Sequence, residues 1–321
     1  MAVRVIPLAA GEGGGDRGDD RVTVLEPGCS YWVDLERPTA AELVWLGEQA
    51  ALHPLVIREL ETESRRPRAE RYDSTLVFTV ASVLWKRGRG LVPCEVRVVF
   101  RADLVVTVHW EPVLEIDEVR ARWEARGYRG EPGLAPAMAV LYDLLDAVLD
   151  RAFQSLDSVN DELDALESAV FADRRQRIVQ RVFRLRRGLL ELRRTIAPLR
   201  EVCNALLGPE TERLGAQAGY VHDLYDRALR ILVQVDTVHD LLAGVLEAHL
   251  SVTSNELNQT MRTLTAWSII LMSLSLIAGI YGMNFRWIPG LEWRWGFTAT
   301  LFVMVFLGVA LYLLFRRIQW L

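Results

Sequence analysis

Residues 263–285 read TLTAWSIILMSLSLIAGIYGMNF and contain no charged side chain. As an α-helix this run would be about 34 Å long, enough to cross the ~30 Å hydrocarbon core of a bilayer. A second charge-free run at residues 295–315 reads WGFTATLFVMVFLGVALYLLF and would span about 31 Å. Between them, residues 286–294 contain Pro289 and Gly290, which interrupt helices. We therefore expect a hairpin of two transmembrane helices joined by a short loop.

The chain outside these two segments is densely charged. Of its 321 residues, 51% are hydrophobic and 25% are charged, yet nearly all the charged ones precede residue 263. A soluble protein spreads its apolar side chains over many amphipathic elements, so this division predicts a soluble part attached to a membrane part. No secretory signal is recognisable at the start, so we expect the soluble part in the cytoplasm. Both ends are then expected on the cytoplasmic side of the cell membrane, where Arg316 and Arg317 follow the second span.

Four regions precede the membrane segments in the predicted organisation. Residues 1–20 are rich in glycine and aspartate and predict a disordered lead-in. Residues 21–135 mix valine-rich strand patterns with short helices, which indicates a cytoplasmic α/β domain. Helical spacing predicts a pair of helices over residues 136–208. No proline occurs between Pro209 and Pro289, which permits a long stalk helix over residues 209–262. We therefore expect an α+β membrane protein. Its C-terminal part consists of a first transmembrane helix at residues 263–285, an external loop at 286–294, a second transmembrane helix at 295–315 and a basic tail at 316–321.

Small, polar and methionine side chains follow one face of the long helix into the first membrane segment. Heptad spacing places on this polar stripe Glu247, Ser251, Ser254, Asn258, Met261, Thr265, Ser268, Met272, Ser275, Gly279 and Gly282. Polar groups in hydrocarbon are unfavourable unless they are satisfied, so a helix surrounded by lipid has no need of such a stripe. It indicates either close packing of helices through small residues or a water-filled path lined by one such helix from each subunit of an oligomer. The stripe alone does not separate these two interpretations.

The first membrane segment ends in IYGMNF, residues 280–285. Here the sequence resembles the CorA family of magnesium transporters, whose signature is a Gly-Met-Asn triplet at the end of the first of two C-terminal spans. The resemblance extends to LIAG at 276–279, to WRWG at 293–296, and to residues 192–202 and 222–250. It implies a homopentamer in which five copies of the long helix line a pore, the second spans face lipid, and a funnel-shaped domain lies in the cytoplasm.

The resemblance also implies which residues meet the transported ion. Gly282, Met283 and Asn284 would form the mouth, where five Asn284 amide oxygens accept hydrogen bonds from the water shell that Mg²⁺ gives up reluctantly. Gly282 would let the backbone turn where the helix ends. Leu264 and Met272 would form narrow apolar rings able to gate by dewetting. The implied pore lining consists of Glu247, Ser254, Asn258, Met261, Leu264, Ser268, Met272, Ser275 and Gly279.

Members of the family close when metal binds at acidic sites between cytoplasmic subunits. Asp223 matches one such carboxylate, and Glu247 falls at a second acidic position of the stalk. The partner region contains Lys86 and Arg87, which are basic where the family has an acid. The sequence therefore leaves two alternatives: a regulatory metal at Asp223, or a salt bridge from Lys86 or Arg87 that replaces it.

The expected substrate is Mg²⁺, with Co²⁺ as a surrogate and Zn²⁺ or Ni²⁺ as further candidates, moving down its electrochemical gradient. The loop has Arg286 and Gly290 where the magnesium branch commonly has acidic residues. The zinc-transporting branch of the same superfamily is therefore the alternative.

Other classes of function find no support in the residues. No glycine-rich phosphate loop, nucleophile elbow or His/Cys/Asp constellation marks an enzyme. Cys29, Cys94 and Cys203 lie far apart without CxxC spacing, so neither a disulfide framework nor a structural zinc site is expected. The arginines between residues 174 and 194 are interpreted as a solvated helix face rather than a nucleic-acid site.

Overall fold

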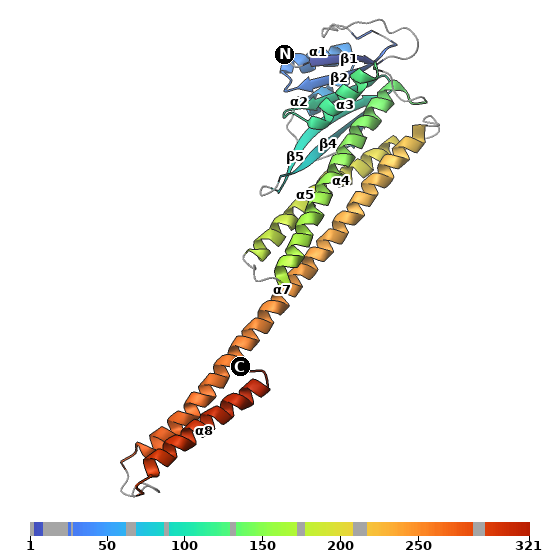
Figure 1. Cartoon of the computed structure of the whole chain (residues 1–321). Helices are drawn as coiled ribbons and strands as arrows, with labels where there is room; N and C mark the ends of the chain where they lie inside the picture. Colours follow the sequence, from blue (N-terminus) through green and yellow to red (C-terminus); the bar gives the residue numbers. More distant parts are fainter. Residues whose placement is uncertain are drawn as a thin grey trace. The chain divides into compact units, whose positions relative to one another are not determined.

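The computed structural model describes residues 3–8, 25–26, 28–61, 69–86, 90–128, 133–171, 177–207, 217–284 and 293–321. The chain divides into two compact units, Met1–Gly244 and Val245–Leu321. The strands found among the described residues all belong to the first unit, whereas the second unit is a pair of helices (Figure 1).

The described residues form a six-stranded sheet in the first unit, with strand order β1-β2-β6-β5-β4-β3. Its strands are β1 (Val3–Leu8), β2 (Ser30–Glu36), β3 (Ala69–Tyr72), β4 (Thr75–Lys86), β5 (Gly90–Arg101) and β6 (Leu104–His109). Within this sheet all neighbours are antiparallel except β2 and β6, which run parallel. The parallel register places Asp34 beside Thr107.

Strand β1 corrects the prediction of a disordered lead-in over residues 1–20. It pairs antiparallel with β2, and its alternate side chains serve the two faces of the sheet. Val3 and Val5 pack against the core on one face, while Ile6 and Leu8 are buried on the other. Because burial of these apolar side chains offsets the entropy of ordering so short a strand, the segment is held at the sheet edge. The rest of the predicted lead-in lies outside the described residues.

One face of the sheet is covered by two helices, α1 (Ala40–Gln49) and α2 (Pro54–Glu61). Helix α1 begins with a capping box, in which Thr39 Oγ1 accepts from the Glu42 N–H and the Glu42 carboxylate accepts from the Thr39 N–H. Gly47 allows α1 to approach α2 closely, because a Cβ atom there would lie 3.0 Å from Cγ1 of Ile57.

The opposite face is covered by three helices, α3 (Leu114–Ala125), α4 (Pro136–Phe171) and α5 (Ile178–Leu206). Helices α4 and α5 both pack on β4, and α3 packs on α4. Ser155 of α4 donates to the carbonyl oxygen of Val83 at 3.0 Å. Trp123 of α3 is fully buried, and its Nε1 donates to Oδ2 of Asp143 at 2.7 Å. The first bond joins α4 to the sheet and the second joins α3 to α4, and both satisfy buried polar atoms.

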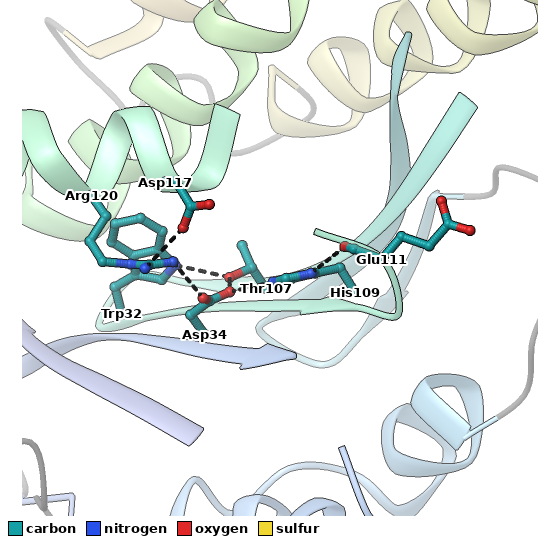
Figure 2. A network of polar contacts seen from close by, with 7 residues as sticks. All are labelled: Trp32, Asp34, Thr107, His109, Glu111, Asp117 and Arg120. Carbon is teal, nitrogen blue, oxygen red and sulfur yellow. Dashed lines mark hydrogen bonds and ion pairs between the residues drawn. The ribbon is translucent and has the colours of Figure 1, made fainter. Parts of the chain in front are cut away.

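A buried polar network joins α3 to β2 and β6 (Figure 2). Thr107 Oγ1 donates to Asp34 Oδ1 at 2.6 Å and accepts from Trp32 Nε1 at 3.1 Å. Arg120 of α3 donates to the other carboxylate oxygen of Asp34 at 2.9 Å. Asp34 is 2% exposed, so its charge depends on these donors for compensation.

Helix α7 (Ala218–Tyr281) contains 64 residues, which corresponds to about 96 Å of helix. Its residues belong to both units, and its length is consistent with the proline-free stretch noted in the sequence. Helix α8 (Gly296–Arg317) lies antiparallel beside the last part of α7 (Figure 1). Both helices are long and apolar enough to cross a membrane, and little of their apolar stretches is buried within the chain.

Candidate functional site

Helix α8 packs against one face of α7 within the second unit. Ala266, Ile270 and Phe315 are buried together, and Leu274 and Leu311 pack around them. The three α7 members recur every four residues, which is the spacing of a single helix face. One side of the first membrane segment is thereby occupied by the second.

The polar stripe lies on the other side of α7. A helix turns about 100° per residue, so Met272 lies about 160° from Ile270, and Ser268 about 160° from Ala266. Met272 is 72% exposed, whereas Ile270 is 5% exposed and Ala266 is 0% exposed. The other lining candidates are also exposed: Glu247, Ser254, Asn258, Met261, Leu264, Ser268, Ser275 and Gly279. The stripe therefore does not serve the packing of α7 against α8 in the same chain.

Several hydroxyl groups along α7 bond to their own helix. Ser268 Oγ donates to the Leu264 carbonyl at 2.8 Å, and Thr260 Oγ1 donates to the Glu256 carbonyl at 2.9 Å. Such bonds use the hydroxyl hydrogen and leave the oxygen lone pairs as acceptors. Ser268 thus presents an acceptor oxygen on the exposed stripe, the kind of group that a hydrated cation can meet.

The Gly-Met-Asn triplet follows directly on the end of α7. The Gly282 N–H donates to the Ala278 carbonyl at 2.9 Å, and the Met283 N–H donates to the Ile280 carbonyl at 3.3 Å. Gly282 lies in the turn that follows α7, but its φ is not positive, so no left-handed conformation requires glycine here. A Cβ atom at this position would instead lie 3.1 Å from the Ala278 carbonyl oxygen, so space favours glycine here.

Met283 and Asn284 are exposed at this end of the helix. The predicted departures of the following loop, at Arg286 and Gly290, lie outside the described residues.

Three polar contacts join α4 to the first part of α7. Tyr142 Oη donates to Asp223 Oδ2 at 3.2 Å, and Arg227 forms ion pairs with Asp146 and Asp150. Burial, together with the charges of Asp146 and Asp223, raises the pKa of Tyr142 to about 12, so the hydroxyl keeps its proton at neutral pH. Burial also raises the pKa of Asp146, against the opposing charge of Arg227.

The candidate regulatory residues do not come together within one chain. Asp223 and Glu247 are exposed positions of α7 that stand 24 residues apart, or about 36 Å along the helix. Over the described ranges, no group of three or more His, Cys, Asp and Glu side chains is arranged to hold a metal ion. Arg87 and the side chain of Lys86 lie outside the described residues, so the alternative salt bridge to Asp223 stays a prediction.

The sequence analysis did not identify the ion pairs between α4 and Arg227 of α7. Asp146 and Asp150 stand four residues apart on α4 and so share one helix face, which signals a cationic neighbour. The identity of that neighbour needed the tertiary structure, since Arg227 lies 77 residues beyond Asp150.

Comparisons with known proteins cover nearly the whole chain. The family model described as CorA-like Mg²⁺ transporter protein matches residues 29–317. The cobalt/magnesium transport protein CorA of Thermotoga maritima is 33% identical over 295 residues, which cover 90% of this chain and 83% of that protein. The divalent cation transporter CmaX of Pseudomonas aeruginosa is 28% identical over 325 residues, which cover 97% of this chain and 94% of that protein.

The fold is also that of a solved transporter. The complete structure of the CorA magnesium transporter from Methanocaldococcus jannaschii superposes with a TM-score of 0.78 at 19% identity, covering 100% of this chain and 99% of that chain. The region matched by the family model, residues 29–317, includes the sheet from β2 onward, the helices on both its faces and the two candidate membrane helices. The chain therefore belongs to the CorA family, whose members are divalent cation transporters and not enzymes.

Proposed function

We propose that five copies of this chain assemble in the cell membrane and conduct hydrated Mg²⁺, with Co²⁺ as a surrogate, down its electrochemical gradient. The observation that carries the proposal is the polar stripe of α7, which is exposed and lies opposite the α8 contact. Two spans are too few to enclose a pore, so a path along the stripe needs several copies around a symmetry axis. Membership of the CorA family supports this arrangement.

Helix α8 faces lipid in the proposed assembly. Its exposed side chains are mostly large and apolar, and include Phe297, Leu301, Phe302, Val303, Val305, Phe306 and Val309. Lipid accepts such side chains without penalty, and the helix satisfies its own backbone. Arg316 and Arg317 at the end of α8 favour the cytoplasmic side, and a large N-terminal unit on the same side fits a two-span hairpin.

Asn284 forms the ion mouth together with Gly282 and Met283 in this proposal. Its amide oxygen accepts hydrogen bonds from the water shell of Mg²⁺, and neutral oxygens hold the ion loosely enough for release. Leu264 and Met272, both strongly exposed on the single chain, form apolar rings that gate the path by dewetting.

Regulation is proposed to involve Asp223 and Glu247 at the contacts between subunits. Each is exposed on α7, so a neighbouring subunit can supply the further oxygen ligands that one chain lacks. The Tyr142 hydroxyl orients the Asp223 carboxylate.

The test is ion entry into liposomes that contain the purified full-length protein and a Mg²⁺-sensitive dye. Wild type should admit Mg²⁺ quickly when the membrane potential is negative inside, and Asn284→Ala should abolish entry while leaving the oligomer intact on native gels. The matched control is Asn255→Ala, because Asn255 is an exposed asparagine of α7 that lies off the polar stripe. It should transport like wild type.

Two outcomes would replace this proposal. Normal Mg²⁺ entry in Asn284→Ala would show that Asn284 does not form the ion mouth. Exclusion of Mg²⁺ while a Zn²⁺ dye responds, particularly under a proton gradient, would assign the chain to zinc transport instead.

A further inference from the structure

The chain reverses direction immediately after α8. Gln319 has φ of +60°, its N–H donates to the Arg316 carbonyl at 3.2 Å, and the Trp320 N–H donates to the Phe315 carbonyl at 2.9 Å. These two hydrogen bonds, with the left-handed Gln319 as the donor of the first, form the Schellman ending of an α-helix. The apolar contact that usually accompanies it is present, since the rings of Phe315 and Trp320 stack with centroids 5.7 Å apart.

The turn brings Trp320 back onto α7. Thr263 Oγ1 donates to the Trp320 carbonyl oxygen at 2.9 Å across 57 residues of sequence. Trp320 and Leu321 also pack against the buried group formed by Ala266, Ile270 and Phe315. We call residues 318–321 with these contacts the Trp320 clasp.

Thr263 departs from the behaviour of its neighbours. The hydroxyls of Thr260, Ser268 and Ser273 each donate to the carbonyl four residues back in their own helix. The Thr263 hydroxyl donates to the clasp instead. The contact therefore replaces a bond that was locally available, which indicates a specific docking position.

The clasp holds α7 at the level of two candidate lining residues. Met261 and Leu264 stand two residues before and one residue after Thr263, and both are strongly exposed. At about 100° per residue they point about 160° and 100° away from the Thr263 direction. A clasp that fixes Thr263 toward α8 thus keeps both side chains turned away from α8.

We propose that Trp320 is a positioning residue for the conduction path, which it controls by holding the rotation of α7 at Thr263. The inference rests on the proposed function, since it takes Met261 and Leu264 as part of the path. Release of the clasp lets α7 rotate, so the apolar ring at Leu264 loses its alignment and the resting influx of divalent ions rises.

The sharpest test uses Gln319, whose exposed side chain can be changed without touching the aromatic contact. Gln319→Gly keeps the left-handed backbone at no steric cost, whereas Gln319→Val disfavours it strongly. In liposomes with equal amounts of inserted protein, Gln319→Gly should admit Mg²⁺ within about twofold of wild type. Gln319→Val should raise the initial influx about fivefold, which corresponds to a shift of about 1 kcal/mol in a two-state contact.

Hydroxyl-radical oxidation of Trp320, measured by mass spectrometry in nanodiscs, reports the clasp itself. Oxidation should increase in Gln319→Val and stay at the wild-type level in Gln319→Gly. A second pair, Trp320→Ala and Trp320→Phe, separates loss of the contact from its conservative replacement, because phenylalanine can still stack on Phe315. Trp320→Ala should raise influx, and Trp320→Phe should restore it toward wild type.

The outcomes separate this inference from the proposed function. If wild type conducts but neither Gln319→Val nor Trp320→Ala changes the influx, the positioning role of Trp320 is overturned and conduction stands. If wild type admits no divalent ion, both proposals fail. A rise in influx for Gln319→Gly equal to that for Gln319→Val would also overturn the role of the turn.

Discussion

Nε2 of His109 lies 3.3 Å from Oδ1 of Asp34, and both side chains are almost fully buried between the sheet and α3 (Figure 2). The other ring nitrogen, Nδ1, lies 2.7 Å from the carbonyl oxygen of Glu111. Because a carbonyl oxygen only accepts hydrogen bonds, Nδ1 carries a proton. If the ring were neutral, Nε2 would then have no proton, and its lone pair would face the negatively charged Asp34 carboxylate, which is unfavourable. The contact between Nε2 and Oδ1 is not aligned as a hydrogen bond, so the attraction is chiefly between an imidazolium and a carboxylate.

The stability of the first unit should therefore decrease as pH rises above neutrality. Burial alone lowers the pKa of His109, but the close contact with the Asp34 carboxylate, with smaller effects of the Glu111 carbonyl and Glu36, raises it overall. Because the folded-state pKa is raised, the contribution is complete below the unfolded value of about 6.5 and is lost as pH passes through the higher folded value. Melting curves of wild type and His109→Gln between pH 6 and pH 9 measure it. The wild-type melting temperature should fall more steeply, and parallel curves would contradict the assignment of a charged His109.

Asp34→Asn should destabilise the first unit by about 3–5 kcal/mol, because it leaves Arg120 and His109 as buried cations without their counter-charge. The matched control is Asp117→Asn, which removes the other carboxylate paired with Arg120. Asp117 is 57% exposed, so its loss should change stability by less than about 1 kcal/mol. Denaturant unfolding followed by the intrinsic tryptophan fluorescence, to which buried Trp32 and Trp123 contribute, gives both values. Similar losses in the two variants would show that burial of Asp34 is not the decisive factor.

Arg227→Gln should loosen the contact between α4 and α7. The change removes the counter-charge of Asp146, whose pKa is already raised by burial, and we expect a loss of about 1–3 kcal/mol. Arg193→Gln is the control, because its ion pair with Asp236 is exposed on both sides and such pairs contribute less than about 1 kcal/mol. Calorimetric melting of the solubilised protein compares them. A larger effect at Arg193 would contradict the interpretation.

Met272→Ser should raise the resting influx of Mg²⁺, because a smaller polar side chain wets the apolar ring proposed at this level. Val305→Ser makes a similar exchange on the exposed face of α8 and should leave influx unchanged. Dye-loaded liposomes again supply the measurement. Equal effects of the two substitutions would place Met272 outside the conduction path.

Several features of the chain follow from its amino-acid sequence alone. The two charge-free runs determine the candidate membrane helices, because the length and composition of a single segment decide whether it can cross a bilayer. The pairing of Thr39 with Glu42 likewise produces a capping box, since both partners lie within one helical turn. The polar stripe is visible from spacing on one helix.

Only the tertiary structure decided which groups meet across long stretches of chain. The spacing of residues along α7 does not say which face of the helix α8 covers. The structure shows that α8 covers the face with Ala266 and Ile270, which leaves the polar stripe exposed. Strand β1 was missed because its short pattern becomes stable only on pairing with β2. Asp34 with His109, and Thr263 with Trp320, are joined by burial and hydrogen bonding between distant segments. Periodicity and composition act over a few residues, whereas such partners are selected by the packing of whole elements against each other.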